Sequence, residues 1–284
     1  MQFEKARQQF RAALAGDGVT SPASVFDAAS ARMAKAAGFE LGILAGSVAS
    51  MAILGAPDLT VISSTELAEQ VGRIARADAL PLMVDADHGY GNALNVARTV
   101  AELECHGASA ITLEDTLLPR AFGQDGAAFI PVEEMEGKLG AALAARRDPG
   151  LVIVGRTATA MAVDIEEAIM RCRRYEAVGV DAVHVAGGLR GRADLDRLAD
   201  AVRVPIILGR ASGELTDLDY LASRGVRILL RGNAAFQDGL VALYDSYTRQ
   251  LGTPRMLDRA ALVRIASAED KYRALADKFM GGAA

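Results

Sequence analysis

The sequence predicts an α/β protein whose strands and helices form a (β/α)8 barrel of the TIM type. Short apolar runs alternate with longer amphipathic stretches along almost the whole chain, which is the pattern of repeated β-α units with a parallel sheet. Eight apolar runs can be distinguished, and right-handed β-α units of that number close into a barrel. A chain of 284 residues with 51% hydrophobic content can bury one large core, so we expect a single domain over residues 1–284.

The expected strands are short segments rich in Val, Ile, Leu and Ala. In chain order they are Ala23–Phe26, Leu41–Leu44, Leu82–Val84, Ala110–Leu113, Leu151–Val154, Ala182–Val185, Ile206–Leu208 and Ile228–Leu230. Helical patterns lie between them, several after an Asp, Ser or Asn that can cap a helix N-terminus. These patterns include Ala28–Ala37, Glu66–Ala77, Ala93–Cys105, Glu133–Arg146 and Ile165–Ala177.

Two segments go beyond a minimal barrel. The connection Asp115–Pro131, after the fourth strand, is long and contains glycine and proline, and such loops often act as lids over a site. After the eighth strand, the helical patterns Ala234–Gln250 and Asp258–Phe279 supply more helix than the barrel needs. We therefore expect the region of about residues 251–284 to pack on a neighbouring subunit.

Composition narrows the class of partner. The formal net charge is -5 and the charged residues are interspersed, so the sequence predicts neither a nucleic-acid nor a membrane partner, and a small substrate is expected. Cys105 and Cys172 have no zinc or disulfide spacing, and we expect both to be reduced, buried thiols. The amphipathic N-terminus lacks the features of a secretory signal, and no run is long enough to span a membrane. A cytoplasmic location is the resulting expectation.

Carboxylates follow two neighbouring strands directly. In barrels of this kind the chemistry lies at the carboxyl ends of the strands, where Asp85 and Asp87 follow the third strand and Glu114 follows the fourth. Hard oxygen donors without a nearby cysteine or imidazole pair favour Mg2+, or Mn2+, over zinc. The alternative is that acidic loop residues cap the next helix, and we favour that interpretation for Asp115 alone.

Other strand ends carry groups suited to an anionic substrate. A 2-oxo acid can chelate a divalent ion, which then acts as a Lewis acid on the keto oxygen. Arg156, after the fifth strand, can bind a carboxylate through two hydrogen bonds, or it can form a structural ion pair. Gly46 and Ser47, after the second strand, offer backbone N–H groups and a hydroxyl, and Asn233 follows the eighth strand.

Several other kinds of site are not supported by the sequence. His88, His106 and His184 have no evident Ser or Cys nucleophile, and structural roles are at least as well supported for them. All five lysines fall in helical patterns rather than at strand ends, which argues against a Schiff-base aldolase. The sequence also lacks a GxxxxGK[ST] phosphate-binding motif.

Five segments, spread over nearly the whole chain, resemble the isocitrate lyase/phosphoenolpyruvate mutase superfamily and most closely its oxaloacetate decarboxylase branch. They are Ser24–Asp27, Gly42–Ser50, Asp85–Asn95, Glu114–Pro119 and Arg156–Thr157. Together these segments are far more specific than any one alone.

The resemblance implies a magnesium site and an assembly. Asp85 would be the principal metal ligand, Asp87 and Glu114 would hold the ion largely through water, and Asp58 would join the same network. It also implies a homotetramer, a dimer of dimers, with C-terminal helices exchanged between subunits.

The resemblance also implies that Ser47 and Arg156 bind substrate carboxylates, and the chain departs from the family pattern in three places. The segment Leu117–Gly123 lacks the cysteine motif of the isocitrate and methylisocitrate lyases, so those activities are not expected. Asn233 stands where the decarboxylase branch usually has a histidine, and Asn cannot carry a titrating proton near neutral pH. The segment Gly209–Gly213 lacks the tyrosine expected there.

The expected activity is Mg2+-dependent decarboxylation of oxaloacetate, or a close 2-oxo diacid, to pyruvate and CO2 through an enolate. Arg156 and Asn233 are the expected catalytic groups, and Gly46 and Ser47 bind substrate beside them. One alternative keeps the metal but breaks another bond, as a C–C lyase or hydrolase or in phosphonopyruvate-type chemistry, with Arg120, Arg210 and Asn233 shaping a different pocket. The other alternative is a ligand-binding protein without catalysis.

Overall fold

The computed structural model describes residues 3–158, 164–187, 189–254 and 256–281. Eight parallel strands form one sheet in which each strand pairs with the next in the chain. They are β1 (Ala23–Ser24), β2 (Gly42–Leu44), β3 (Leu82–Asp85), β4 (Ala110–Glu114), β5 (Val152–Ala158), β6 (Ala182–Ala186), β7 (Ile206–Gly209) and β8 (Val226–Leu230). A parallel bridge joins Thr20, just before β1, to Ile228 in β8, so the sheet curls back on itself. The TIM-type fold expected from the alternating pattern is confirmed.

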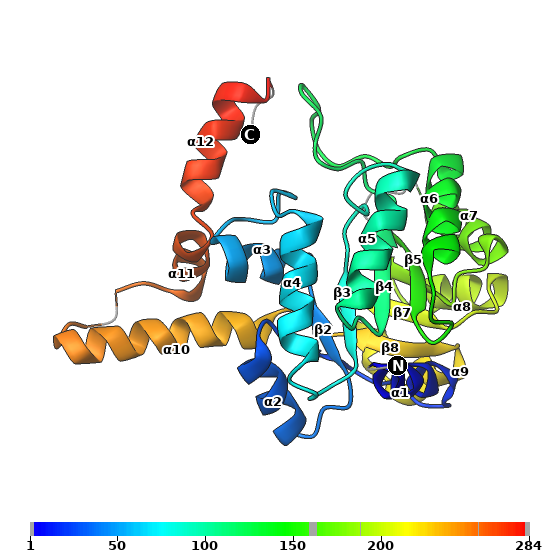
Figure 1. Cartoon of the computed structure of the whole chain (residues 1–284), viewed down its shortest axis with the longest axis horizontal. Coiled ribbons are helices and arrows are strands. Elements are labelled where there is room, and N and C mark those ends of the chain that lie inside the picture. The colour runs from blue at the N-terminus through cyan, green and yellow to red at the C-terminus, as the bar shows by residue number, and fades with distance from the viewer. Residues whose placement is uncertain (1–2, 159–163, 188, 255, 282–284) are drawn as a thin grey trace.

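Helices lie before, between and after the strands, and those between the strands cover the outside of the sheet (Figure 1). They are α1 (Glu4–Ala15), α2 (Ala28–Ala36), α3 (Gly46–Leu54), α4 (Ser64–Ala75), α5 (Ala93–Cys105), α6 (Val132–Ala145), α7 (Ile165–Val178), α8 (Arg192–Ala201), α9 (Leu218–Ser223), α10 (Ala234–Leu251), α11 (Arg259–Ala266) and α12 (Glu269–Phe279), with a 3-10 turn at Gly213–Thr216. Predicted N-caps are present, because Asp27, Ser63 and Asn92 each accept a backbone N–H of the helix that follows. Among the described residues, no helix is both long and apolar enough to span a membrane.

The core has two layers because strand side chains alternate between the two faces of the sheet. One layer, which includes Leu103, Ile111 and Leu139, lies between the sheet and its helices. The other fills the barrel, where Phe10 and Leu14 of α1 pack with residues from seven strands, β2 to β8, such as Met83. Helix α1 therefore covers one end of the barrel, leaving the opposite end, where the strands terminate, for the site.

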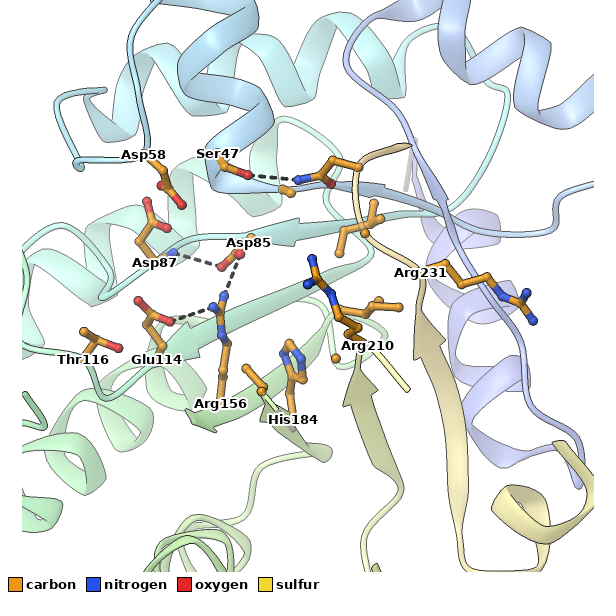
Figure 2. Close-up of a pocket in the computed structure, with 18 of the residues that line it drawn as sticks. Ser47, Asp58, Asp85, Asp87, Glu114, Thr116, Arg156, His184, Arg210 and Arg231 are labelled. Atoms are coloured by element: carbon orange, nitrogen blue, oxygen red, sulfur yellow. Dashed lines mark hydrogen bonds and ion pairs between the residues drawn. The ribbon is translucent and has the colours of Figure 1, made fainter. Parts of the chain in front are cut away.

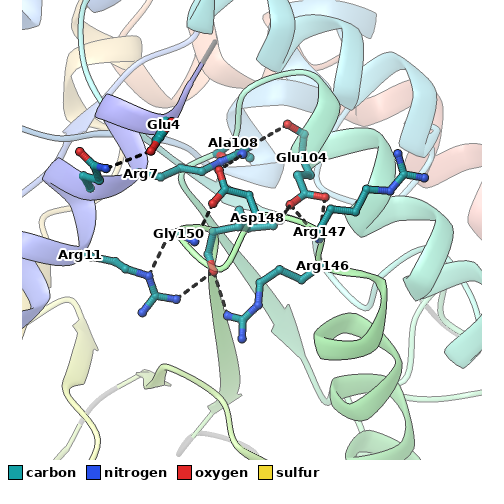
Figure 3. A network of polar contacts seen from close by, with 11 residues as sticks. Glu4, Arg7, Arg11, Glu104, Ala108, Arg146, Arg147, Asp148 and Gly150 are labelled. Carbon is teal, nitrogen blue, oxygen red and sulfur yellow. Dashed lines mark hydrogen bonds and ion pairs between the residues drawn. The ribbon is translucent and has the colours of Figure 1, made fainter. Parts of the chain in front are cut away.

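A buried polar network fastens α1 to the barrel (Figure 3). Arg7 is only 3% exposed and donates to Asp148 Oδ2 at 2.6 Å and to the carbonyl oxygens of Ala108 and Glu104. The Glu104 carboxylate in turn accepts the backbone N–H groups of Arg147 and Asp148. Each buried charge thus has a partner, as burial requires.

Four details differ from the sequence-based expectation. Strand β1 ends at Ser24 instead of Phe26, and β5 continues past Val154 to Ala158. The predicted helix Asp258–Phe279 is two helices, because Ala268 has a left-handed backbone with φ 49° that interrupts the helical hydrogen bonds. Cys105 is exposed rather than buried, since it ends α5 on the solvent side, whereas Cys172 is buried as expected.

The last three helices form an arm rather than a further barrel layer. Helix α10 extends away from the sheet, and α11 and α12 turn back past α3 (Figure 1). Large apolar side chains on this arm are exposed, among them Tyr247 at 54%, Leu251 at 77% and Ile265 at 64%. A surface with this much exposed apolar area is typical of one that packs against another protein.

Candidate active site

A cavity of about 620 Å3 opens where the strands end at their carboxyl termini, the location expected for a barrel enzyme. The predicted residues Ser47, Asp58, Asp85, Asp87, Glu114, Arg156 and Asn233 all line it (Figure 2). Gly46 lies directly behind the wall, where a Cβ atom would come within 2.6 Å of Asp87 Oδ1. The barrel therefore brings together every predicted site residue, although they are spread over residues 46–233 of the chain.

Arg156 links the carboxylates of two strands. Its Nη1 lies 2.6 Å from Asp85 Oδ2 and its Nη2 lies 3.0 Å from Glu114 Oε2. The register of the sheet sets this arrangement, because Glu114 in β4 pairs directly with Arg156 in β5. Thr112 Oγ1 also donates to Asp85 Oδ1 at 3.2 Å. A guanidinium has five N–H donors, so these two ion pairs leave others for a substrate carboxylate.

Asp87 owes its position to an unusual backbone. Its φ of 46° places it in the left-handed region, and its carboxylate is directed toward Gly46 at the start of α3. Burial and the negative charges of Asp85, Asp58 and Glu114 raise the pKa of Asp87 well above its usual range. Burial and Asp85 likewise raise the pKa of Asp58. These carboxylates are crowded together with more negative charge than Arg156 balances.

The ion pairs separate the protonation behaviour of Asp85 and Glu114. Burial is the largest single influence and disfavours the Asp85 carboxylate, but Arg156 and smaller contributions, including the backbone N–H of Asp87, together outweigh it, so the pKa of Asp85 is lowered. Burial is also the largest cause at Glu114, where Arg156 opposes it only in part, and the pKa of Glu114 rises to about 7. The same two carboxylates raise the pKa of Arg156, which stays charged. Of these two carboxylates, Asp85 is thus the one that is fully ionised near neutral pH.

The donor set fits a hard divalent cation bound mainly through one carboxylate. Within the described ranges, no three Asp, Glu, His or Cys side chains form a ready-made cage for a metal ion. Mg2+ does not need one, because it keeps several waters and takes one or two carboxylates together with groups of its ligand. A positive charge placed beside Asp85 would also offset the repulsion that raises the pKa of Asp87 and Asp58.

The wall opposite Arg156 contains a hydroxyl and an amide. Asn233 Nδ2 donates to Ser47 Oγ at 3.1 Å, and Ser24 Oγ donates to Asn233 Oδ1 at 3.3 Å. Ser47 lies in the first turn of α3, whose initial N–H groups have no partner within the helix. An anion placed here would meet the Ser47 hydroxyl, helix N–H groups and the Asn233 amide.

The three histidines have different surroundings. His106 is the C-cap of α5, and His88 is buried beside Tyr90 and does not line the cavity, so neither belongs to the site. His184 does line the cavity, and neither ring nitrogen has a hydrogen-bond partner in the described structure. Burial, aided by Arg156, lowers the pKa of His184 to about 3, so its imidazole is neutral.

Sequence reasoning undervalued His184 and did not single out Thr112. Strand register places His184 beside Arg156, and that register is visible only in the folded sheet. Asp115 is not the helix cap that the sequence predicts, because α6 begins after Pro131 and the Asp115 side chain is fully buried with Tyr175 and Arg171, away from the cavity. Its backbone N–H and C=O bond to Arg156 and Ile130, which holds both ends of the 115–131 loop against the sheet.

The chain shares sequence with known proteins over most of its length. The phosphoenolpyruvate phosphomutase family model matches residues 10–251. An oxaloacetate decarboxylase of Bradyrhizobium diazoefficiens is 49% identical over 269 residues, covering 94% of this chain and 93% of the relative. An oxaloacetate decarboxylase of Rhodopseudomonas palustris strain BisB18 is 51% identical over 257 residues, covering 90% and 89% of the two chains.

Solved structures agree with this relationship. A phosphonopyruvate hydrolase in complex with oxalate and Mg2+ superposes with a TM-score of 0.76 at 29% identity, covering 96% of this chain and 99% of that one. An oxaloacetate acetylhydrolase in complex with 3,3-difluorooxaloacetate has the same fold at 24% identity, with a TM-score of 0.76 and 98% of each chain covered. The chain therefore belongs to the phosphoenolpyruvate mutase/isocitrate lyase family.

Proposed function

We propose that this protein decarboxylates oxaloacetate, or a close 2-oxo diacid, to pyruvate and CO2 with the help of Mg2+. The observation that carries the proposal is the cavity itself. Asp85, paired with Arg156, provides an oxygen donor on one wall, while Ser47 and Asn233 provide anion-binding donors on the other. The relatives named oxaloacetate decarboxylase, about half identical over most of the chain, support the choice of substrate.

In this reaction the C3–C4 bond of oxaloacetate breaks and CO2 leaves from C4. The bonding electron pair forms the C2–C3 double bond of the pyruvate enolate, whose charge rests on the former keto oxygen, and a proton then adds to C3. A divalent cation held by Asp85, with Asp87, Glu114 and Asp58 reaching it largely through water, would stabilise the charge on that oxygen.

The protein groups then orient the substrate. Arg156 stays charged and has N–H donors left for a carboxylate, and Ser47 adds a hydroxyl and the N-terminus of α3. Asn233 holds the Ser47 hydroxyl in place and can donate a hydrogen bond, but it cannot supply the proton to C3. That proton therefore comes from solvent or from another group that reaches C3.

Arg210 and Asn233 favour a second candidate reaction, which forms the same kind of enolate but breaks a different bond. Both line the cavity at positions where the chain departs from the decarboxylase branch, so the bond broken could differ while the enolate is retained. A panel of 2-oxo and 2-hydroxy diacids, phosphonopyruvate among them, assayed with Mg2+ distinguishes a decarboxylase from a C–C lyase or phosphonopyruvate hydrolase.

We further propose that the protein is a cytoplasmic homotetramer, a dimer of dimers joined through the C-terminal arm. The exposed Tyr247, Leu251 and Ile265 support an arm that packs on another subunit. Light scattering after gel filtration tests this, with Leu251→Glu expected to lower the mass and the exposed Asp219→Asn on α9 serving as control.

The activity has a direct test. Purified protein with Mg2+ and oxaloacetate should form pyruvate faster than Mg2+ alone, and Asp85→Ala should abolish the excess rate. Asp219→Asn removes a carboxylate from an exposed helix and should leave the excess intact. Equal rates with and without wild-type protein would contradict the proposed activity.

A further inference from the structure

Arg210, directly after β7, is a cation of the cavity whose side chain pairs with none of the described residues. Three arginines line the cavity, and two of them are engaged, because Arg156 pairs with Asp85 and Glu114 and Arg231 donates to Ser21 Oγ at 3.0 Å. Within the described part of the chain, the Arg210 guanidinium has no hydrogen bond or ion pair. Figure 2 shows it projecting into the cavity, whereas Arg231 points away.

The backbone at Arg210 is held in a conformation that an arginine rarely adopts. Its φ is 52°, in the left-handed region, and its N–H donates to Leu230 O at 3.1 Å, which extends the pairing of β7 with β8 by one residue. Residues in such conformations persist where the surroundings impose them, and they are concentrated at ligand sites. From this position the Arg210 side chain enters the cavity (Figure 2).

The barrel places Arg210 opposite the carboxylates. Strand β7 lies four positions from β3, which carries Asp85, in an eight-stranded sheet that curls back on itself. A 2-oxo diacid whose keto end is bound on the Asp85 side therefore directs its second carboxylate toward the β7 side. A dianion needs a positive charge near each end, and Arg210 is the charge available there.

We infer that Arg210 is a specificity-determining residue that binds the carboxylate remote from the keto group, so that the site selects 2-oxo diacids over 2-oxo monoacids. The inference rests on the proposed function and adds to it a protein group that binds the second carboxylate of the substrate. In a decarboxylation this carboxylate loses its charge as CO2 forms, so the ion pair is stronger with substrate than in the transition state. Removing Arg210 should therefore raise KM without lowering kcat.

Two ligands that differ in the distal carboxylate test the inference. Oxalate has no distal carboxylate, whereas 3,3-difluorooxaloacetate has one. Their Kd values are measured by calorimetry with Mg2+ on the full chain. Arg210→Asn removes the charge, and asparagine tolerates a left-handed backbone. The matched control is Arg231→Asn, which removes one positive charge from the rim of the same cavity.

Loss of one charged hydrogen-bonding contact corresponds to a loss of about tenfold to a hundredfold in affinity. We expect Arg210→Asn to lower the affinity for difluorooxaloacetate by such a factor and the affinity for oxalate by less than about twofold. Arg210→Lys should recover part of the lost affinity. Arg231→Asn should change the affinities for both ligands equally. With oxaloacetate, Arg210→Asn should raise KM without lowering kcat.

Equal losses for both ligands with Arg210→Asn, or no loss for either, would overturn the inference. So would a wild-type protein that binds oxalate but not difluorooxaloacetate. A wild-type protein that binds neither ligand contradicts the proposed function and this inference with it, whereas oxalate binding without discrimination by Arg210 contradicts the inference alone. Thermal melts of each variant establish that the loss is not one of folding.

Discussion

The carboxylate of Asp85 in β3 accepts a 2.6 Å hydrogen bond from the guanidinium of Arg156 in β5, and strand β4 lies between these two strands. The proposed principal metal ligand and the proposed substrate-binding cation are therefore in direct contact. A change in the charge of Arg156 should therefore change the affinity of Asp85 for a metal ion, and a change in the charge of Asp85 should change the affinity of Arg156 for a carboxylate.

Arg156→Gln should move the affinities for metal and substrate in opposite directions. Removing the guanidinium removes its repulsion of a divalent cation but also its attraction for an anion. We expect Mg2+ to bind about tenfold more tightly and the KM for oxaloacetate to rise about a hundredfold, the latter reflecting a lost charged contact. Calorimetry and steady-state kinetics measure the two quantities. Arg273→Gln on the exposed α12 is the control, and a parallel loss of both affinities would contradict this account.

Glu114 should make the metal-free protein less stable as pH rises from about 4.5 to about 7. Its pKa is raised from 4.5 to about 7 in the folded protein, so across this window the folded state holds a proton that the unfolded state has released. The free energy of unfolding therefore falls with rising pH, and Glu114→Gln, which does not titrate, should flatten the dependence. Urea unfolding in EDTA at pH 5 and pH 8 measures this, with the exposed Glu133→Gln as control.

The same protonation should weaken metal binding in acid. A proton on Glu114 must leave before the carboxylate can assist a cation, so the affinity for Mg2+ should increase as pH rises through about 7. Calorimetric titrations across this range give the affinity directly. In Glu114→Gln the increase should be smaller, and an identical pH profile in the two proteins would show that Glu114 takes no part.

Asn233→Asp should lower kcat/KM more than Asn233→Ala does. Asn233→Asp keeps the acceptor for Ser24 but loses the donor to Ser47 and puts a negative charge where an anion is proposed to bind. We expect kcat/KM for oxaloacetate to fall about tenfold with Ala, from the lost hydrogen bonds, and further with Asp. If Ala proves the more harmful of the two, the amide N–H is not what the site requires.

Arg7 should matter for stability and not for catalysis. Arg7→Ala leaves the buried Asp148 without its ion-pair partner, and breaking a buried pair in this way costs about 3–5 kcal/mol. Because α1 covers the end of the barrel away from the cavity, KM should be unchanged. Arg11→Ala, which removes a partly exposed partner of Asp181, should cost about 1 kcal/mol or less. Chemical unfolding measures both, and equal costs would be evidence against the burial argument.

The order of residues alone predicts the fold class and most of the acidic and polar residues that line the cavity. Apolar runs of strand length alternate with helical patterns because each β-α unit must bury one face, and that requirement is local enough to be visible in the order of residues. Asp85, Asp87, Glu114 and Arg156 were identifiable because the residue that ends a barrel strand always faces the same end of the barrel.

Tertiary structure decided which of these residues touch. The Arg156–Glu114 contact follows from strand register, the burial of Asp115 from packing against α7, and the break at Ala268 from a single left-handed residue. The first two are set by residues far away in the chain. The direction of the Arg210 side chain and the neutral state of His184 likewise depend on groups far away in sequence. Burial and electrostatic interactions arise from the groups that folding brings together.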